Sequence, residues 1–261
     1  MLVRNVILDW SGTLVDDLMP VFKTTNHVLE TCGCPPITLQ EFRTEFCLPI
    51  RKFYQRRIPD IPQATLEKIF LAQYPEWRDD IRLLPHTLGF LRFCARRGFG
   101  VYIASTVDRA TYHYQTKRFG IEDYITKPYI GIEDKTQKIH QILHENALIP
   151  GQTLFVGDME HDIEAGKAGG VHTCAVLTGY NHVEKLRAMS PDLICEHLGE
   201  LQRTLVERAS VEGQDRDQGS GNGRTHRLGA GDGKAARNLL GKPVVREESS
   251  KKCGIESHCD A

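Results

Sequence analysis

The chain has 261 residues, and its 33 Lys and Arg nearly balance its 34 Asp and Glu, for a formal net charge of −1. This balance excludes a global field that would attract nucleic acid or an anionic membrane, so any phosphate binding must come from locally gathered charge. No apolar run approaches the roughly 20 residues that span a bilayer, and no signal-peptide pattern precedes the first strand. We therefore expect a cytoplasmic protein without nucleic-acid or membrane partners.

The first predicted element is a buried strand that ends on a carboxylate. The run from Val3 to Leu8 is followed directly by Asp9-Trp10-Ser11-Gly12-Thr13-Leu14, where the glycine lets the backbone turn sharply. Asp9 is thus placed at the carboxyl end of a strand, where open α/β sheets bind their ligands. It can serve there as a covalent nucleophile, as a metal ligand or as both. The alternative is an Asp that only caps the next helix.

Residues 16–82 are predicted to form an all-helical insert, called the cap from here on. Apolar residues recur at helical spacing from Leu18 to Leu29, and Thr38 or a neighbouring residue is placed to cap the next helix. The predicted helices after the first one are Leu39–Phe46, Ile50–Arg57 and Ala64–Tyr74. Prolines separate them and no strand pattern intervenes.

From Pro85 onward, helices and strands alternate. Helices are predicted at Thr87–Arg97, Arg109–Phe119, Lys135–Glu145 and Asp162–Gly169, and strands at Val101–Ala104, near Tyr124–Ile125, near Tyr129–Ile132, at Thr153–Val156 and at Thr173–Leu177. Such alternation implies parallel pairing through right-handed crossovers. The predicted fold class is α/β: a three-layer, doubly wound parallel sheet with the helical cap inserted after the first strand.

The C-terminal part of the chain has a different composition. Gly, Ser, Asn, Asp and Arg dominate residues 213–233. Such a segment cannot bury enough apolar surface to offset the entropy lost on ordering. We therefore predict a disordered tail over residues 207–261.

Polar residues follow two further strands. Ser105 and Thr106 come after Val101–Ala104, where hydroxyl and N–H groups can donate to an anion; the alternative is an N-cap for the next helix. Asp158 and Asp162 follow Thr153–Val156 and stand four residues apart at a helix entry, so both can face one point. Two carboxylates directed together repel each other unless a cation lies between them, which favours Mg²⁺ over simple capping.

A lysine opens the helix predicted at 135–145. Lys135 places a positive charge at a helix N-terminus, where the helix dipole disfavours it. A residue that opposes local preference often serves a site. Lys138, one turn later, is the rival candidate, and ordinary surface solvation is the alternative for both.

In this order the segments resemble the four motifs of the haloacid dehalogenase (HAD) superfamily. Asp9 stands in the first, Ser105 in the second, Lys135 in the third, and Asp158 with Asp162 in the fourth. The resemblance covers about residues 3–205, and the stretch from 168 to 180 is similar to phosphoglycolate-phosphatase-like members. It implies a HAD-like core formed by residues 1–15 and 83–206, the cap at 16–82, and a phosphohydrolase whose partner is a small phosphorylated metabolite.

The resemblance also implies roles for single residues. Asp9 would be the nucleophile that forms an aspartyl-phosphate, and Lys135 would offset charge during transfer. The implied Mg²⁺ ligands are Asp9, the backbone carbonyl of Ser11, Asp158 and Asp162. The implied substrate-binding residues are Gly12, Thr13, Ser105, Thr106 and Lys135, and the implied catalytic residues are Asp9, Ser11 and Lys135.

Ser11 departs from the family pattern Asp-x-Asp-Gly-Thr, because it replaces the second Asp. In the family that Asp protonates the leaving group and later activates water, which a Ser hydroxyl cannot do near neutral pH; the loss typically costs about 10² to 10⁴ in rate. Three alternatives follow: a slow phosphatase in which water and a neighbour such as His161 substitute, a substrate whose leaving group needs no proton, or a silent phospho-ligand-binding protein. For the second, the chain resembles phosphonoacetaldehyde hydrolases at Asp-Trp-x-Gly-Thr, which use a cap lysine as a Schiff base, and Lys52 lies at a comparable place in the cap. An exposed cap lysine is the alternative for Lys52.

Overall fold

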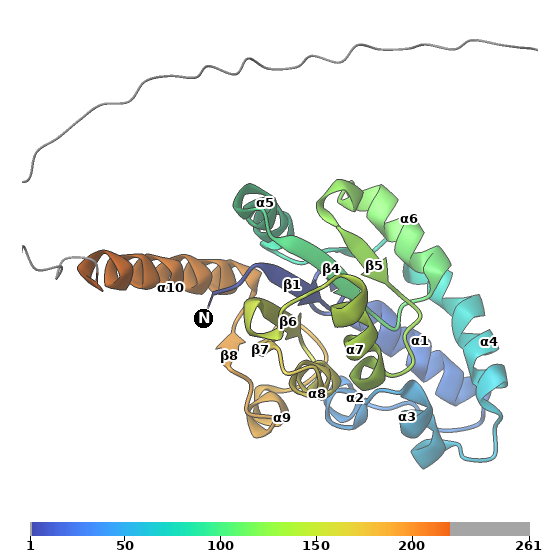
Figure 1. Ribbon diagram of the computed structural model, residues 1–261. Helices are drawn as coiled ribbons and strands as arrows, with labels where there is room; N and C mark the ends of the chain where they lie inside the picture. Colours follow the sequence, from blue (N-terminus) through green and yellow to red (C-terminus); the bar gives the residue numbers. More distant parts are fainter. Residues whose placement is uncertain (1, 220–261) are drawn as a thin grey trace, which may run out of the picture. The chain divides into compact units, whose positions relative to one another are not determined.

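The structure is a computed structural model that describes residues 2–219; Met1 and residues 220–261 lie outside it. Its centre is a six-stranded parallel sheet in the order β5-β4-β1-β6-β7-β8 (Figure 1). The strands are β1 (Asn5–Leu8), β4 (Gly100–Ala104), β5 (Lys127–Tyr129), β6 (Thr153–Gly157), β7 (His172–Val176) and β8 (Leu193–Cys195). From β1 the chain first adds β4 and β5 on one side of the sheet and then adds β6, β7 and β8 on the other side. This change of side confirms the predicted doubly wound α/β class.

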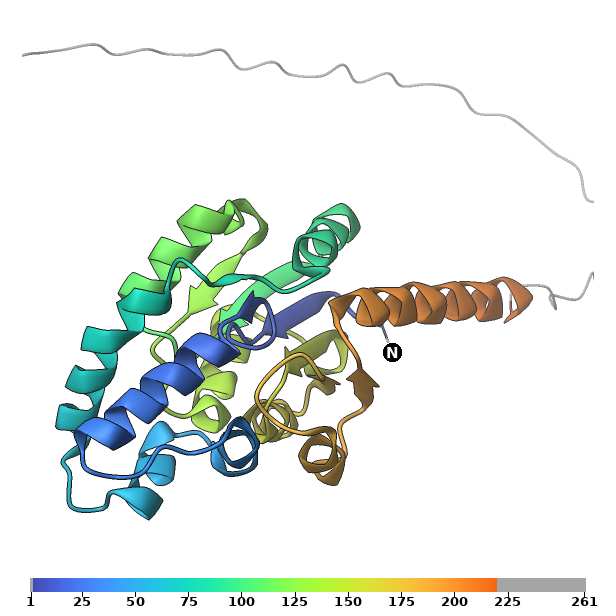
Figure 2. The same cartoon turned by 180° about the vertical axis from the view of Figure 1, so that it is seen from behind.

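Helices cover both faces of this sheet (Figures 1 and 2). Those that pack on it are α5 (Thr87–Arg97), α6 (Arg109–Phe119), α7 (Lys135–Glu145), α8 (Glu160–Ala168), α9 (Val183–Ala188) and α10 (Leu198–Gly219). Alternate side chains of β1 point to opposite faces: Val6 and Leu8 join the cluster with α5, α6 and α10, whereas Ile7 joins the cluster with α7 and α8. Strands buried on both faces read as continuous apolar runs, which is why these strands could be predicted.

The cap follows β1 in the sequence. It contains α1 (Leu18–Thr31), α2 (Leu39–Glu45), α3 (Ile50–Arg57) and α4 (Gln63–Gln73), and ends in a 3-10 helix, Tyr74–Trp77. β2 (Val15–Asp16) pairs antiparallel with β3 (Arg82–Leu83), so the chain enters and leaves the cap at the same place. The division of the described residues into core and cap stays a prediction.

An aromatic cluster forms the interior of the cap. The Phe42 ring lies 4.6 Å from Phe46 and 6.2 Å from Phe53, measured between ring centroids. The Phe46 ring also stacks on Tyr180, which belongs to the loop after β7, at 5.3 Å. The cap therefore packs directly on a loop of the α/β core.

The structure corrects four sequence-based expectations. The strand expected near Tyr124–Ile125 is a 3-10 turn, Glu122–Tyr124, because the Ile125 N–H donates back to the Glu122 carbonyl instead of to a strand. The next strand ends at Tyr129 rather than continuing to Ile132. Beyond Tyr129 the chain turns away to bond with the loop after β4, where the Ile132 N–H donates to the Ser105 carbonyl. β8 and α9 were not predicted.

The fourth correction concerns the C-terminal segment. α10 runs to Gly219, past the boundary at Glu207 where the disordered tail was expected to begin. Four of the five residues around that boundary, Leu205 to Ala209, are good helix formers and none is proline, so a helix already begun at Leu198 continues. The remainder of the predicted tail, residues 220–261, lies outside the described residues. Within residues 2–219, no helix combines the length and the apolar character that crossing a membrane requires.

Thr38 caps α2 as predicted, in a reciprocal capping box. Its Oγ1 accepts from the Glu41 N–H at 3.1 Å, and the Glu41 carboxylate accepts from the Thr38 N–H at 2.7 Å. We expect Thr38→Ala to lower the free energy of unfolding by about 1 kcal/mol, measured by denaturant unfolding. Thr44→Ala is the control, because Thr44 is exposed in the same helix and its side-chain hydroxyl donates back to the Gln40 carbonyl without capping the helix. Equal losses in the two variants would contradict a capping role.

Candidate active site

Parallel pairing brings three strand ends to one edge of the sheet. Leu8 of β1 lies beside Ile103 of β4 on one side and Val156 of β6 on the other. The residues that follow these strands therefore emerge together, and the Asp9 N–H continues the ladder by donating to the Val156 carbonyl at 2.9 Å. The loops that carry the predicted site residues thus meet because of the strand register.

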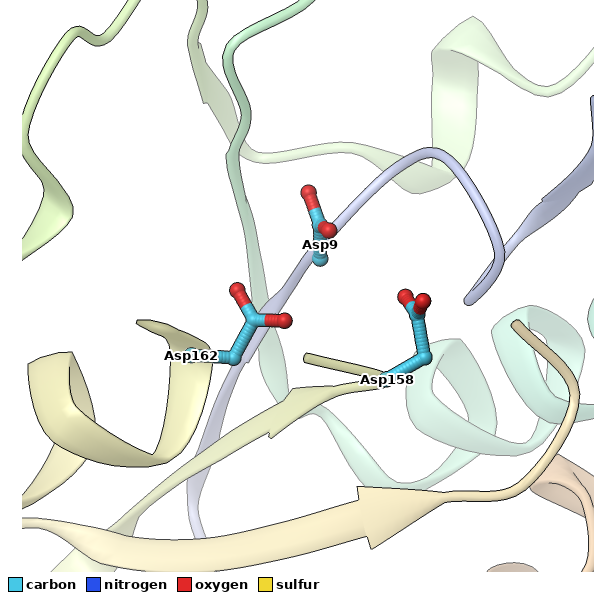
Figure 3. Close-up of side chains that lie close together, drawn as sticks. All are labelled: Asp9, Asp158 and Asp162. Atoms are coloured by element: carbon cyan, nitrogen blue, oxygen red, sulfur yellow. The ribbon is translucent and has the colours of Figure 1, made fainter. Parts of the chain in front are cut away.

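Three buried carboxylates form the centre of this edge (Figure 3). One oxygen from each of Asp9, Asp158 and Asp162 lies within 4.8 Å of the other two. Burial raises the pKa of Asp9 to about 6, against the opposing effect of the nearby Lys135 ammonium. Burial, together with the charges of Asp9 and Asp162, raises the pKa of Asp158 well above its usual range. The fold thus gathers negative charge where water cannot screen it.

Lys135 partly compensates that charge. Its Nζ lies 2.7 Å from Asp9 Oδ1 and 2.7 Å from Asp162 Oδ1, and the side chain is 1% exposed. Burial alone lowers the pKa of an ammonium, but the charges of Asp162 and Asp9 outweigh burial and raise the pKa of Lys135. Lys138 lies apart from the carboxylates and donates to Gln141 on its own helix. Of the two candidate lysines, the structure places Lys135 in the cluster.

The charge balance and the donor types fit a divalent cation. Three carboxylates and one ammonium leave a formal charge of −2 when all four groups are ionised. Hard cations such as Mg²⁺ prefer carboxylate and carbonyl oxygens of this kind. A bound dication would relieve the repulsion that raises the pKa of Asp9 and of Asp158.

Two glycines and two donors hold Asp158 in place. Thr13 Oγ1 donates to Asp158 Oδ1 at 2.9 Å, and the Tyr180 N–H donates to Oδ2 at 2.8 Å. Gly12, at a φ of +73°, and Gly179 approach so closely that an added Cβ would lie 2.5 Å and 2.0 Å from Asp158 Oδ2. Gly12 and Thr13, predicted to bind substrate, therefore also contact the buried carboxylate.

Asp162 caps α8 and is also a member of the carboxylate cluster. Its Oδ2 accepts from the Met159 N–H at 3.0 Å at the start of α8, while its Oδ1 accepts from Lys135. Capping and membership of the cluster are therefore compatible, because each uses a different oxygen. Gly157 makes this possible, since a Cβ there would lie 2.2 Å from Asp162 Cγ.

Ser105 and Thr106 lie on the cavity side of the carboxylates. Ser105 is buried, and its Oγ accepts from the Val107 N–H at 3.2 Å, which leaves the hydroxyl hydrogen to donate into the cavity that it lines. Thr106 lines the same cavity and is exposed. Neither residue caps α6, because Asp108 does so by accepting from the Thr111 N–H at 2.9 Å. The capping alternative for Ser105 and Thr106 is therefore wrong.

Ser11 has a partner that the sequence did not indicate. Its Oγ donates to Asp17 Oδ2 at 2.6 Å, and the Tyr180 hydroxyl donates to Asp17 Oδ1 at 3.0 Å. Asp17 is 2% exposed, and burial raises its pKa to about 7 although both hydrogen bonds oppose the rise. In the sequence, nothing distinguishes Asp17 from the adjacent Asp16, whose side chain is exposed.

A cavity of about 1230 Å³ lies beneath the cap and reaches Asp9, the member of the carboxylate cluster that lines it. It is lined from the core by Asp9, Ser11, Asp17, Ser105, Thr106, Lys138 and Tyr180, and from the cap by Phe46, Arg51, Tyr54, Leu66, Phe70 and Tyr74. Lys52 is exposed and, unlike its neighbour Arg51, is not among the residues that line this cavity in the described part of the chain. His161 is buried behind Lys135, where its Nε2 accepts from the Lys135 N–H at 3.3 Å.

The tight approach of Gly12 to Asp158 generates a prediction. Gly12→Ala adds left-handed strain, which costs about 1–2 kcal/mol, and also displaces Asp158. Gly33→Ala is a matched control, because Gly33 has a φ of +76° but nothing within 4 Å of an added Cβ. We expect MgCl₂ to raise the melting temperature of wild type and Gly33→Ala, and to have no effect on Gly12→Ala. An equal Mg²⁺ effect in both variants would show that Asp158 need not stay in place.

Comparisons with known proteins agree with this geometry. Residues 6–176 match the haloacid dehalogenase-like hydrolase family. The chain is 25% identical over 212 residues to a phosphoglycolate phosphatase of Pseudomonas putida, covering 76% of this chain and 78% of that protein. It is 34% identical over 216 residues to a phosphoglycolate phosphatase of Aliivibrio fischeri, covering 74% and 92%. A solved haloacid dehalogenase-like hydrolase from Streptococcus pneumoniae shares the fold, with a TM-score of 0.68 at 20% identity over 77% of this chain and 98% of that one. The chain belongs to the haloacid dehalogenase-like hydrolase family, as its four motifs predict.

Proposed function

We propose that the protein is a Mg²⁺-dependent phosphohydrolase that transfers the phosphoryl group of a small phosphate ester to Asp9. The observation that carries the proposal is the contact of Lys135 with Asp9 and Asp162, at the edge of the cavity and beside Asp158. Family membership and the phosphoglycolate phosphatase relatives support a phosphatase. A two-carbon acid phosphate is one member of the substrate class to test.

In the first step, Asp9 attacks phosphorus. Lys135 holds Asp9 Oδ1, which fixes the direction of the carboxylate and leaves Oδ2 to form the new bond. The Asp9–phosphorus bond forms as the ester P–O bond breaks, and the leaving oxygen departs with the bonding electrons and takes a proton from solvent water. Lys135 offsets the repulsion between the carboxylate and the phosphoryl group, while Ser105 donates to a phosphoryl oxygen.

In the second step, water attacks the aspartyl-phosphate. The bond from water oxygen to phosphorus forms while the Asp9–phosphorus bond breaks, which regenerates the carboxylate. The residues that would hold Mg²⁺ are Asp9, Asp158, Asp162 and the Ser11 backbone carbonyl. When bound, the ion would neutralise charge on the transferring phosphoryl group.

The alternative reading, C–P bond cleavage through Lys52, gains no support from the geometry. A Schiff-base lysine needs a desolvated amine that reaches the substrate, whereas Lys52 is exposed and lies outside the cavity lining. His161 does not fit as a substitute acid either, because its Nε2 is occupied by the Lys135 N–H. Burial, followed by the charge of Lys135, also lowers the pKa of His161.

Asp9→Asn tests the nucleophile. We expect it to lower phosphate release from a panel of esters by more than about a hundredfold, because an amide cannot form the covalent intermediate. Asp16→Asn removes an exposed carboxylate on the same segment and should leave the rate unchanged. Malachite-green detection of phosphate, with MgCl₂ present, provides the measurement. No release by wild type, with BeF₃⁻ still raising its melting temperature, would replace the proposal with a silent phospho-ligand-binding protein.

Asp158→Asn tests the metal requirement. A chelator should abolish wild-type activity and MgCl₂ should restore it. We expect Asp158→Asn to need at least about tenfold more Mg²⁺ for half-maximal activity, since one anionic ligand is lost. Asp123→Asn is the control, because Asp123 is exposed and is not among the residues within 2–219 that line the cavity. Full activity in the presence of the chelator would contradict Mg²⁺ dependence.

A further inference from the structure

Among residues 2–219, six acidic residues line the cavity, and two of them are buried, Asp9 and Asp17. The mechanism above uses Asp9 but not Asp17. Asp17 lies at the start of the cap, is 2% exposed, and lines the cavity together with Ser11. The partners that the structure gives its two oxygens are both hydroxyl groups, those of Ser11 and Tyr180. Burying a carboxylate is costly, and neutral donors compensate for the loss of water only in part. A buried acid of this kind beside a reaction centre is a candidate for function.

We propose that Asp17 is a positioning residue that acts through Ser11, and that the Ser11–Asp17 pair holds the water that hydrolyses the aspartyl-phosphate. This inference rests on the proposed function. It assigns to two residues, six positions apart, part of the work that a single Asp performs at position 11 in other members of the superfamily.

The direction of the Ser11 hydroxyl carries the argument. A hydroxyl has one hydrogen to donate and two lone pairs that accept. Because the hydrogen of Ser11 is committed to Asp17 at 2.6 Å, the lone pairs remain for a donor in the cavity. A water molecule that donates to Ser11 Oγ turns its own lone pair away from Ser11 and toward the substrate. Without Asp17, the hydroxyl would rotate among several directions, and the water would lose this orientation.

The pair need not change its protonation state in this role. Water oxygen bonds to phosphorus, the Asp9–phosphorus bond breaks, and the proton of the attacking water passes to a phosphoryl oxygen. Asp9 is released as a carboxylate, the second hydrogen of the water stays on the attacking oxygen, and the product is dihydrogenphosphate. In the second step the pair orients the attacking water. In the first step it supplies no acid for the leaving group.

The contact between Ser11 and Asp17 decides which variants can test Ser11. Ser11→Asp alone would set two carboxylates in contact in a buried place, because Asp17 Oδ2 already lies 2.6 Å from the side chain at position 11. The exchange variant, Ser11→Asp with Asp17→Ser, keeps one carboxylate and one hydroxyl in contact and avoids this repulsion. Comparing Ser11→Asp with the exchange variant therefore separates the chemistry of the pair from simple packing.

The experiment uses para-nitrophenyl phosphate with MgCl₂, since its leaving group needs no proton and the second step is then exposed. We expect Ser11→Ala and Asp17→Asn each to lower kcat about tenfold and to lower KM in proportion, so that kcat/KM is unchanged, because only the second step is slowed. The variant that combines Ser11→Ala with Asp17→Asn should be no worse than either single variant. Acid quenching should trap more phosphoenzyme in these variants than in wild type. The exchange variant should exceed Ser11→Asp by at least tenfold in kcat.

The outcomes distinguish this inference from the proposed function. If wild type is active and Asp9→Asn is not, the proposed function stands whatever the pair does. Multiplicative effects of Ser11→Ala and Asp17→Asn, or an unchanged phosphoenzyme level, would then overturn the role of Asp17. An exchange variant no better than Ser11→Asp would overturn it as well. Inactive wild type would instead remove the proposed function on which the inference rests.

Discussion

The structure depends on one electrostatic constraint: three carboxylates and one ammonium are buried together at the carboxyl edge of a parallel sheet. Lys135 contacts Asp9 and Asp162 directly, and Asp158 completes the cluster within 4.8 Å. Such a group is stable only if every oxygen is held and the remaining charge is offset. The glycines that approach Asp158 and Asp162, and the N–H groups that bond to them, follow from this requirement.

Much of this arrangement could be predicted from the sequence, because it depends on local signals that recur in order. The helices Thr87–Arg97, Arg109–Phe119 and Lys135–Glu145 have the bounds that apolar periodicity and the flanking residues indicate. The placement of Lys135 in the cluster was signalled by its conflict with the helix dipole, since a misplaced charge needs a partner elsewhere. Strand register then brings the separate loops together without any long-range signal in the sequence.

What could not be predicted depends on contacts between segments with no shared pattern. Asp17 and Asp16 are adjacent acids, and only the fold decides that the first is buried against Ser11 and the second exposed. The prediction of a strand near Tyr124–Ile125 was wrong for a similar reason, because β5 at Lys127–Tyr129 takes the position beside β4. Short apolar runs are ambiguous until a neighbouring strand selects among them.

Tyr180 contacts both the carboxylate cluster, which the sequence predicted, and Asp17, which the sequence did not single out. Its backbone N–H donates to Asp158 in the carboxylate cluster, its hydroxyl donates to Asp17, and its ring stacks on Phe46 of the cap. One residue therefore links the cap, the Ser11–Asp17 pair and the cluster. Because the ring is held by cap aromatics while the N–H is held by the core, the orientation of Asp17 depends on how the cap packs. The contact between Ser11 and Asp17 is thus linked, through Tyr180, to the part of the fold that covers the cavity.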